Sequence, residues 1–141
     1  MSGHLQTCVL TLFLLIWATP GLADLAIVTA RDSAIETLDR DVAEQLYLGR
    51  LNALRDGTSV RLLDLPQGPE RDRFYQRLIG KNPLQTRAYW SRMVFSGRVR
   101  PPRELRTPTA VREALQQDAH LIGYLPEAEI TPELRILLTV D

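Results

Sequence analysis

The sequence predicts a single α/β domain of three layers, in which helices flank a mixed or parallel sheet. Residues 25–30 read LAIVTA, and an apolar run of this length is typical of a strand covered on both faces. Strand-length apolar runs then alternate with helical segments that carry capping residues. Residues 24–141 contain no repeat, low-complexity tract or long linker, so one core is enough for them.

Residues 1–23 are predicted to be a secretory signal. The run CVLTLFLLIW has the length of a signal h-region and is shorter than the roughly 20 apolar residues of a membrane span. Pro20 and Gly21 end the run, and the small residues of GLA fit a cleavage after Ala23. The n-region lacks Lys and Arg, so an uncleaved membrane anchor is the alternative. We expect a periplasmic domain over residues 24–141.

The first half of this domain contains two predicted strands and a helix between them. After the strand at 25–30 and a polar loop, residues 38–49 form a helix that Asp39 caps and Gly49 ends. The helix should bury Val42, Leu46 and Tyr47. A loop with an Asp56-Gly57 turn then leads to the second strand, residues 59–65.

Three helices follow. The first runs from about Pro69 to Ile79 and stops at Gly80, and its predicted buried residues are Phe74, Leu78 and Ile79. Asn82-Pro83 begins the second, which extends to Gly97 with an apolar stripe of Leu84, Ala88 and Met93 or Val94. Residues 98–105 form a proline-broken connector, and Thr107-Pro108 begins the third helix. The chain closes with a short strand at 120–125, a loop or single turn, and a last strand at 134–140.

Composition excludes several classes of function. All charged residues lie after residue 23, with 17 basic and 17 acidic side chains, so neither nucleic acid nor an anionic membrane is an expected partner. The only cysteine, Cys8, lies in the predicted signal, which leaves the domain without a disulfide or a thiolate metal site. His120 is the only histidine after the signal, and no serine has a G-x-S-x-G context. We therefore expect no enzyme, no metal and no cofactor.

Two features point toward anions. The turn Pro66-Gln67-Gly68-Pro69 leads from a strand into a helix N-terminus, where free N–H groups and the helix dipole favour an oxyanion, and Arg71 adds charge. The alternative is a structural turn in which Glu70 and Asp72 satisfy the dipole. The second feature is the arginine series of the connector: Arg98, Arg100, Arg103 and Arg106. This series is either a solvated connector or the edge of an anion cleft or partner-docking face.

Several segments in order resemble the substrate-binding proteins of phosphate ABC transporters, in the type 2 periplasmic-binding-protein superfamily. The matching segments are Leu46-Tyr47-Leu48-Gly49-Arg50, Arg55-Asp56-Gly57, the strand and turn at 60–69 with Phe74, and His120-Leu121-Ile122-Gly123-Tyr124-Leu125. The chain has room for about one of the family's two lobes and resembles the second. Where the family's phosphate turn carries hydroxyls, this chain has Gly68-Pro69-Glu70-Arg71.

The resemblance implies a secreted solute-binding-like protein that binds phosphate or another small oxyanion. By position, the candidate ligand residues are Thr29, Ser33, Gln67, Gly68 and Arg71. The candidate partner or anion face is Arg98, Arg100 and Arg103. An ABC transporter or a sensor ectodomain is the implied protein partner, and a homodimer is a further candidate. The alternative function is a periplasmic interaction or adaptor module with no small-molecule ligand.

Overall fold

The computed structural model describes residues 24–97 and 99–141. The strands are β1 (Leu25–Ala30), β2 (Arg61–Asp64), β3 (Arg103–Glu104), β4 (Leu121–Pro126) and β5 (Leu134–Val140). The helices are α1 (Arg40–Tyr47), α2 (Pro69–Ile79), α3 (Pro83–Phe95), α4 (Pro108–Gln117) and the short 3-10 turn η1 (Glu127–Glu129). No helix in the described part is long and apolar enough to cross a membrane.

The strands form one mixed sheet in the order β3-β2-β4-β1-β5. β2 runs parallel to both β3 and β4, whereas β1 runs antiparallel to β4 and β5. β1 lies inside the sheet between β4 and β5 and is buried along its length, which explains its unbroken apolar sequence. β3 is a two-residue edge strand within a segment where we expected only a connector. It pairs with Leu63 and Asp64 of β2.

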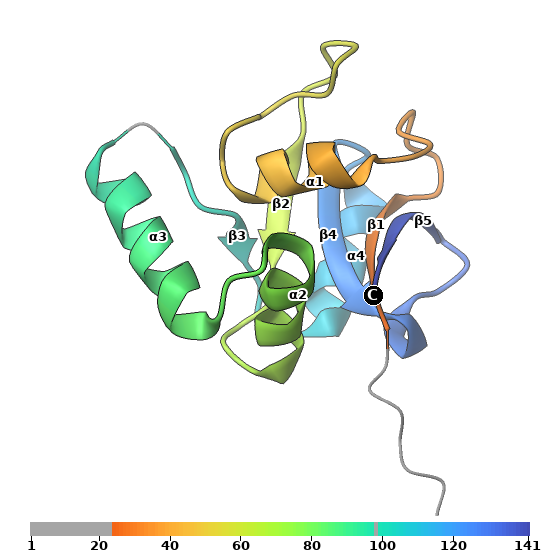
Figure 1. Ribbon diagram of the computed structural model, residues 1–141. Coiled ribbons are helices and arrows are strands. Elements are labelled where there is room, and N and C mark those ends of the chain that lie inside the picture. The colour runs from red at the N-terminus through yellow and green to blue at the C-terminus, as the bar shows by residue number, and fades with distance from the viewer. Residues whose placement is uncertain (1–23, 98) are drawn as a thin grey trace, which may run out of the picture.

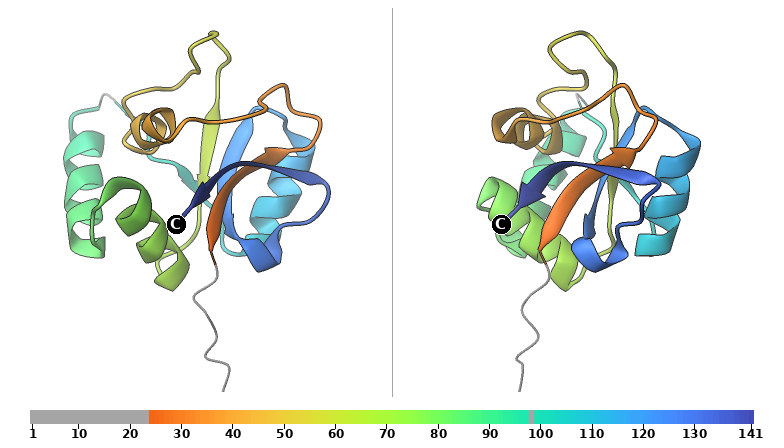
Figure 2. Two further views of the ribbon diagram at one scale, coloured as in Figure 1. Left: turned by 45° about the vertical axis from the view of Figure 1, so that its right-hand side comes forward. Right: turned by 90° about the vertical axis from the view of Figure 1, so that its right-hand side faces the viewer.

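Helices cover both faces of the sheet and confirm the predicted three-layer α/β class. Helix α4 lies on one face, against β4 and β1, while α1 and α2 lie on the other (Figures 1 and 2). The core between sheet and helices contains an aromatic cluster of Tyr47, Phe74, Tyr75 and Tyr124. Tyr75 was not among the residues that the helical pattern predicted to be buried.

The helix boundaries follow local capping chemistry. Asn82 and Gln85 form a capping box at the start of α3, with bonds of 2.9 and 3.0 Å, and Thr107 Oγ1 accepts from Ala110 N–H at the start of α4. Gly80 ends α2 in the left-handed conformation with φ of 73°. Asp39 occupies the N-cap position of α1 but makes no side-chain cap bond, so its predicted capping role is wrong.

Helix α3 lies at the periphery of the molecule, beyond α2 and near β3 (Figure 1). Its predicted apolar stripe is wrong, because Leu84 is 74% exposed and Ala88 is exposed, while the buried positions are Thr86 and Trp90. Val94 and Phe95 are 50% and 95% exposed. The helix therefore packs through Thr86 and Trp90 and leaves other apolar side chains in solvent.

Candidate functional site

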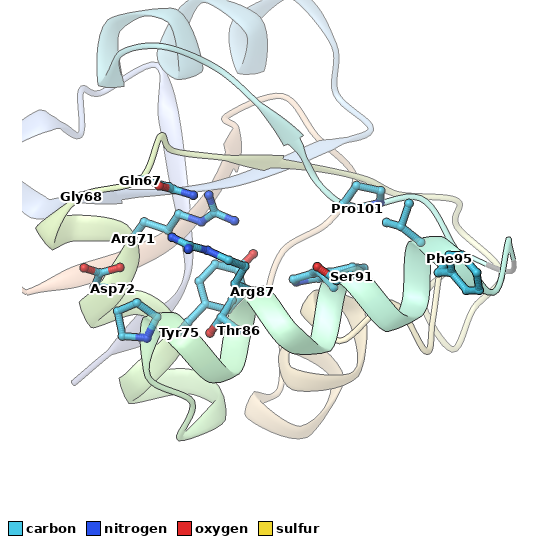
Figure 3. Close-up of a pocket in the computed structure, with 13 residues that line it drawn as sticks. Gln67, Gly68, Arg71, Asp72, Tyr75, Thr86, Arg87, Ser91, Phe95 and Pro101 are labelled. Carbon is cyan, nitrogen blue, oxygen red and sulfur yellow. The ribbon is translucent and has the colours of Figure 1, made fainter.

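A groove opens at the N-terminus of α2, between α2, α3 and the connector that leads to β3. Its volume is about 630 Å³. The lining residues are Gln67, Gly68, Arg71, Asp72, Tyr75, Pro83, Thr86, Arg87, Trp90, Ser91, Val94, Phe95 and Pro101. Figure 3 shows a polar end near Gln67, Arg71 and Arg87 and an apolar end near Phe95 and Pro101. We call this space the α2 groove.

Three of the predicted ligand residues, Gln67, Gly68 and Arg71, line the α2 groove together. The strand β2 ends at Asp64, and the turn that follows places these residues where α2 begins. Asp72 N–H donates to Gly68 O over 3.0 Å and closes the first turn of the helix. Pro69 has no N–H, so the backbone donors left without an intrahelical acceptor are those of Gly68, Glu70 and Arg71.

Arg87 of α3 contributes a second guanidinium to the same groove. In Figure 3 the side chains of Arg71 and Arg87 extend toward one another from α2 and α3. The sequence pattern did not single out Arg87, because nothing local distinguishes it from the other arginines of its helix. It is exposed, and none of the ion pairs among the described residues involves it. Two like charges that face one space favour an anion between them.

Arg71 also has protein partners. Its Nε lies 3.4 Å from Asp64 Oδ2, and its Nη1 lies 3.5 Å from Glu104 Oε2. The guanidinium carbon lies 5.6 Å from the centroid of the Tyr75 ring. Arg71 thus joins β2, β3 and α2, and the two carboxylates offset part of the charge that it presents to the groove. Asp72 adds a further carboxylate to the lining.

Beneath Arg71 lies a buried carboxylate that the sequence did not reveal. Asp64 is 3% exposed and accepts hydrogen bonds from Tyr124 Oη, from Tyr75 Oη at 2.8 Å and from Leu65 N–H at 2.9 Å. Burial raises the pKa of Asp64, and this effect is larger than the opposite effect of the hydrogen bonds and of Arg71, which lower the pKa. Burial, followed by the charge of Asp64, raises the pKa values of Tyr75 and Tyr124 well above 10.0. Both phenols therefore stay protonated and donate.

Thr86 is a further polar member of the α2 groove. It is 6% exposed, and its Oγ1 has no hydrogen-bond partner among the described residues. A buried hydroxyl without a partner is uncommon and unfavourable. Its position in α3 gave no signal in the sequence, where Thr86 lies between Gln85 and Arg87 in a helix with little amphipathic pattern.

The other predicted ligand residues lie elsewhere. Thr29 Oγ1 donates to Leu121 O and Ser33 Oγ donates to Ala119 O, each over 2.8 Å. Both residues are buried, and neither lines the α2 groove. Their hydroxyls fasten β1 and the loop after it to the segment around β4. Arg98 lies outside the described residues, whereas Arg100 and Arg103 line a different groove on the other side of the connector.

The described residues contain no group of three or more His, Cys, Asp or Glu side chains that could hold a metal ion. His120, the residue before β4, places Nδ1 3.2 Å from Ser59 O in an exposed contact. Apart from the carboxylate of Asp72, the polar chemistry of the α2 groove consists of guanidinium groups, backbone N–H groups, an amide and hydroxyls. These groups bind oxygen-rich anions by hydrogen bonds and charge.

The mixed five-stranded sheet, its helices on both faces and a helix N-terminus after the strand β2 define the fold of a solute-binding-protein lobe. Comparison with solved structures confirms the predicted resemblance to phosphate ABC transporter substrate-binding proteins at the level of the fold. An ABC-type phosphate transport receptor from Vibrio cholerae has a TM-score of 0.63 at 11% identity, over 82% of this chain and 45% of that one.

Two further structures give the same result. A putative phosphate ABC transporter substrate-binding protein with bound phosphate from Clostridium perfringens has a TM-score of 0.63 at 12% identity, over 82% of this chain and 44% of that one. PstS from Borrelia burgdorferi has a TM-score of 0.61 at 13% identity, over 82% of this chain and 46% of that one. This chain thus matches about half the length of each protein. No protein-family model and no curated protein matches the sequence.

Proposed function

We propose that this protein is a non-enzymatic, solute-binding-like module that binds a small oxyanion, phosphate among them, in the α2 groove. The observation that carries the proposal is that the N-terminus of α2 and the guanidinium groups of Arg71 and Arg87 border the same groove. Two of the solved structures with the same fold support this reading, because they are an ABC-type phosphate transport receptor and a putative phosphate substrate-binding protein with bound phosphate.

The bound anion would accept hydrogen bonds from the backbone N–H groups of Glu70 and Arg71. The positive end of the α2 dipole would add to this interaction. Arg87 would supply a charge that forms no ion pair among the described residues. Gln67 would donate its side-chain amide from the turn.

The same geometry limits the affinity. Pro69 lacks a donor, Asp72 brings a carboxylate to the groove, and Arg71 shares its charge with Asp64 and Glu104. We therefore expect binding weaker than that of a ligand enclosed between two lobes, because one face of the anion stays in water.

The proposal includes a location and a partner. A signal over residues 1–23 would deliver the domain to the periplasm. There the domain would pass the anion to an ABC transporter or sense the anion together with one. Two proteins with this fold, a phosphate transport receptor and a putative phosphate ABC transporter substrate-binding protein, support that assignment.

Isothermal titration calorimetry with phosphate and sulfate tests the proposal. We expect heat of binding for at least one of them and a matching rise in Tm, since a ligand that binds only the folded state stabilises it. Arg87→Ala should weaken binding, whereas Arg92→Ala, an exposed arginine of the same helix outside the groove, should not. Absence of binding at millimolar anion, or equal loss in both variants, would reject the oxyanion site.

A second candidate function is a periplasmic interaction module whose partner is a transporter or a sensor ectodomain. The exposed apolar side chains of α3, Leu84, Val94 and Phe95, favour it, since such residues commonly pack in interfaces. Light scattering at increasing concentration distinguishes a homodimer from a monomer. If this face forms a dimer, the Phe95→Ser variant should abolish self-association. If the wild-type protein stays a monomer at every concentration, the face can serve only a different protein.

A further inference from the structure

A second groove lies on the other side of the connector from the α2 groove. It is bordered by the end of α1, the segment after it, the start of β2 and the connector itself, and its volume is about 710 Å³. The lining residues are Leu46, Gly49, Arg50, Leu51, Asn52, Val60, Arg61, Leu62, Leu63, Trp90, Val99, Arg100, Pro101, Pro102, Arg103 and Leu121. We call it the arginine groove, because four of these residues are arginines and none is acidic.

The four arginines come from three separate parts of the chain. Arg50 follows α1, Arg61 begins β2, and Arg100 and Arg103 belong to the connector and β3. The sequence showed only the last two as a cluster. The fold therefore doubles the positive charge at this place, in a chain whose formal net charge is zero.

Gly49 allows the two walls of the groove to approach. Its φ is 71°, and a Cβ atom there would lie 2.6 Å from Val99 Cγ1 and 3.0 Å from the Trp90 ring. Any other residue would push the connector away from the end of α1. The walls therefore depend on a local backbone geometry that only glycine adopts readily.

Most of this charge is uncompensated. Arg61 forms an ion pair with Asp118, but the ion pairs of the described residues include none for Arg50, Arg100 or Arg103. All four side chains are exposed at the rim. The base of the groove is apolar, because it consists of four buried side chains: Val60, Leu63, Trp90 and Leu121. A ligand that fits this arrangement carries several negative charges around an apolar body.

We propose that the arginine groove is a second binding site that takes an organic anion with at least two negative charges and an apolar or aromatic body. Its volume lies within the range of roughly 300–1,000 Å³ that small-molecule sites occupy. Guanidinium groups bind phosphate and carboxylate oxygens through paired hydrogen bonds, so an organic phosphate and a dicarboxylate share the required chemistry. The apolar base distinguishes such ligands from inorganic phosphate, which has no apolar surface to bury.

The two sites are separate but adjacent. Trp90 and Pro101 line both grooves and form the partition between them. The arginine groove contains no residue of the α2 N-terminus. The proposal therefore does not rest on the oxyanion function and can succeed or fail independently of it.

Calorimetric titration with phenyl phosphate, phthalate and inorganic phosphate tests this inference. Phenyl phosphate and phthalate represent the organic phosphate and the dicarboxylate, and at least one should bind about tenfold more tightly than inorganic phosphate. The double variant Arg50→Ala/Arg100→Ala should lose that binding by about tenfold or more, on the order of 1.4 kcal/mol. Arg55→Ala/Arg106→Ala removes the same charge from exposed positions outside the groove and should bind as the wild type does.

Each outcome separates the two sites. Binding that depends on Arg50 and Arg100 and is unchanged in Arg87→Ala supports the arginine groove, whether or not inorganic phosphate binds. Loss of phenyl phosphate and phthalate binding in Arg87→Ala alone assigns those ligands to the α2 groove and overturns this inference. Equal weakening of binding in the two double variants would show that only the net charge matters, and it would also overturn this inference. Absence of binding at millimolar ligand would do the same. Circular dichroism melts confirm that every variant is folded.

Discussion

Tyr124 joins the buried carboxylate of Asp64 to the aromatic cluster of the core. Its hydroxyl donates to Asp64 Oδ1, while its ring stacks on Phe74 with the centroids 3.6 Å apart and the planes 1° from parallel. Tyr124 comes from β4, Asp64 from the end of β2 and Phe74 from α2. This one side chain therefore fixes α2, and with it the α2 groove, to the sheet.

We predict that Tyr124→Phe and Tyr75→Phe each lower the free energy of unfolding by about 1–3 kcal/mol. Each variant removes a donor from a buried carboxylate that water cannot reach to replace it. Tyr47→Phe is the control, because Tyr47 Oη donates to the neutral carbonyl of Leu63 over 3.2 Å, and its loss should be about 1 kcal/mol. Urea unfolding measures the three values, and equal values would contradict a special role for Asp64.

We predict that the stability contributed by Asp64 falls as pH rises. Burial raises its pKa above 3.8, so between 3.8 and the raised pKa the folded state binds more protons than the unfolded state. The contribution is then fully present below pH 3.8 and is lost as pH rises through the raised pKa. The measurement is the difference in free energy of unfolding between wild type and Asp64→Asn, in which other titrating groups cancel. A difference that grows with pH would show that the hydrogen bonds and Arg71 outweigh burial.

We predict that α3 opens more readily than the rest of the domain. It buries only Thr86 and Trp90, whereas α2 buries Phe74, Tyr75 and Leu78. Hydrogen exchange should be faster in α3 than in α2, and Asn82→Ala should accelerate it further by removing the capping box, at about 1 kcal/mol. Thr107→Ala removes the cap of α4 and should leave α3 exchange unchanged. Equal protection of α2 and α3 in the wild type would contradict this prediction.

The sequence predicted the layers of the fold because its signals there were local. The apolar run at 25–30, the Asn82-Pro83 and Thr107-Pro108 starts and the stop at Gly80 each act within a few residues. The α3 stripe was wrong because the helix packs on α2 and on the end of α1, so its burial depends on neighbours that periodicity does not reveal.

The grooves could be predicted only in part for the same physical reason. Gln67, Gly68 and Arg71 are adjacent in sequence and were predicted together, whereas Arg87, Thr86 and Asp64 join them only through tertiary packing. Position at the first strand and its following loop predicts Thr29 and Ser33 as ligand contacts, but their hydroxyls meet backbone carbonyls that only the fold brings near. Arg50 and Arg61 likewise reach Arg100 only in the fold.

We predict that Glu70→Ser strengthens oxyanion binding in the α2 groove severalfold. Glu70 places a carboxylate in the first turn of α2, where it competes with a bound anion for the helix dipole. The change also introduces a hydroxyl donor. Glu36→Ser, at an exposed position outside the groove, is the control for the change in net charge. Weaker binding after Glu70→Ser would place the anion elsewhere.

The central claim is that a small oxyanion binds at the N-terminus of α2. A titration of the ¹⁵N-labelled protein with phosphate, followed by the amide resonances, tests it most directly. We predict saturable shifts that are largest for the N–H groups of Gly68, Glu70 and Arg71, with the amide of Arg87 also affected. No saturable shift, or shifts confined to residues away from the first turn of α2, would contradict the claim.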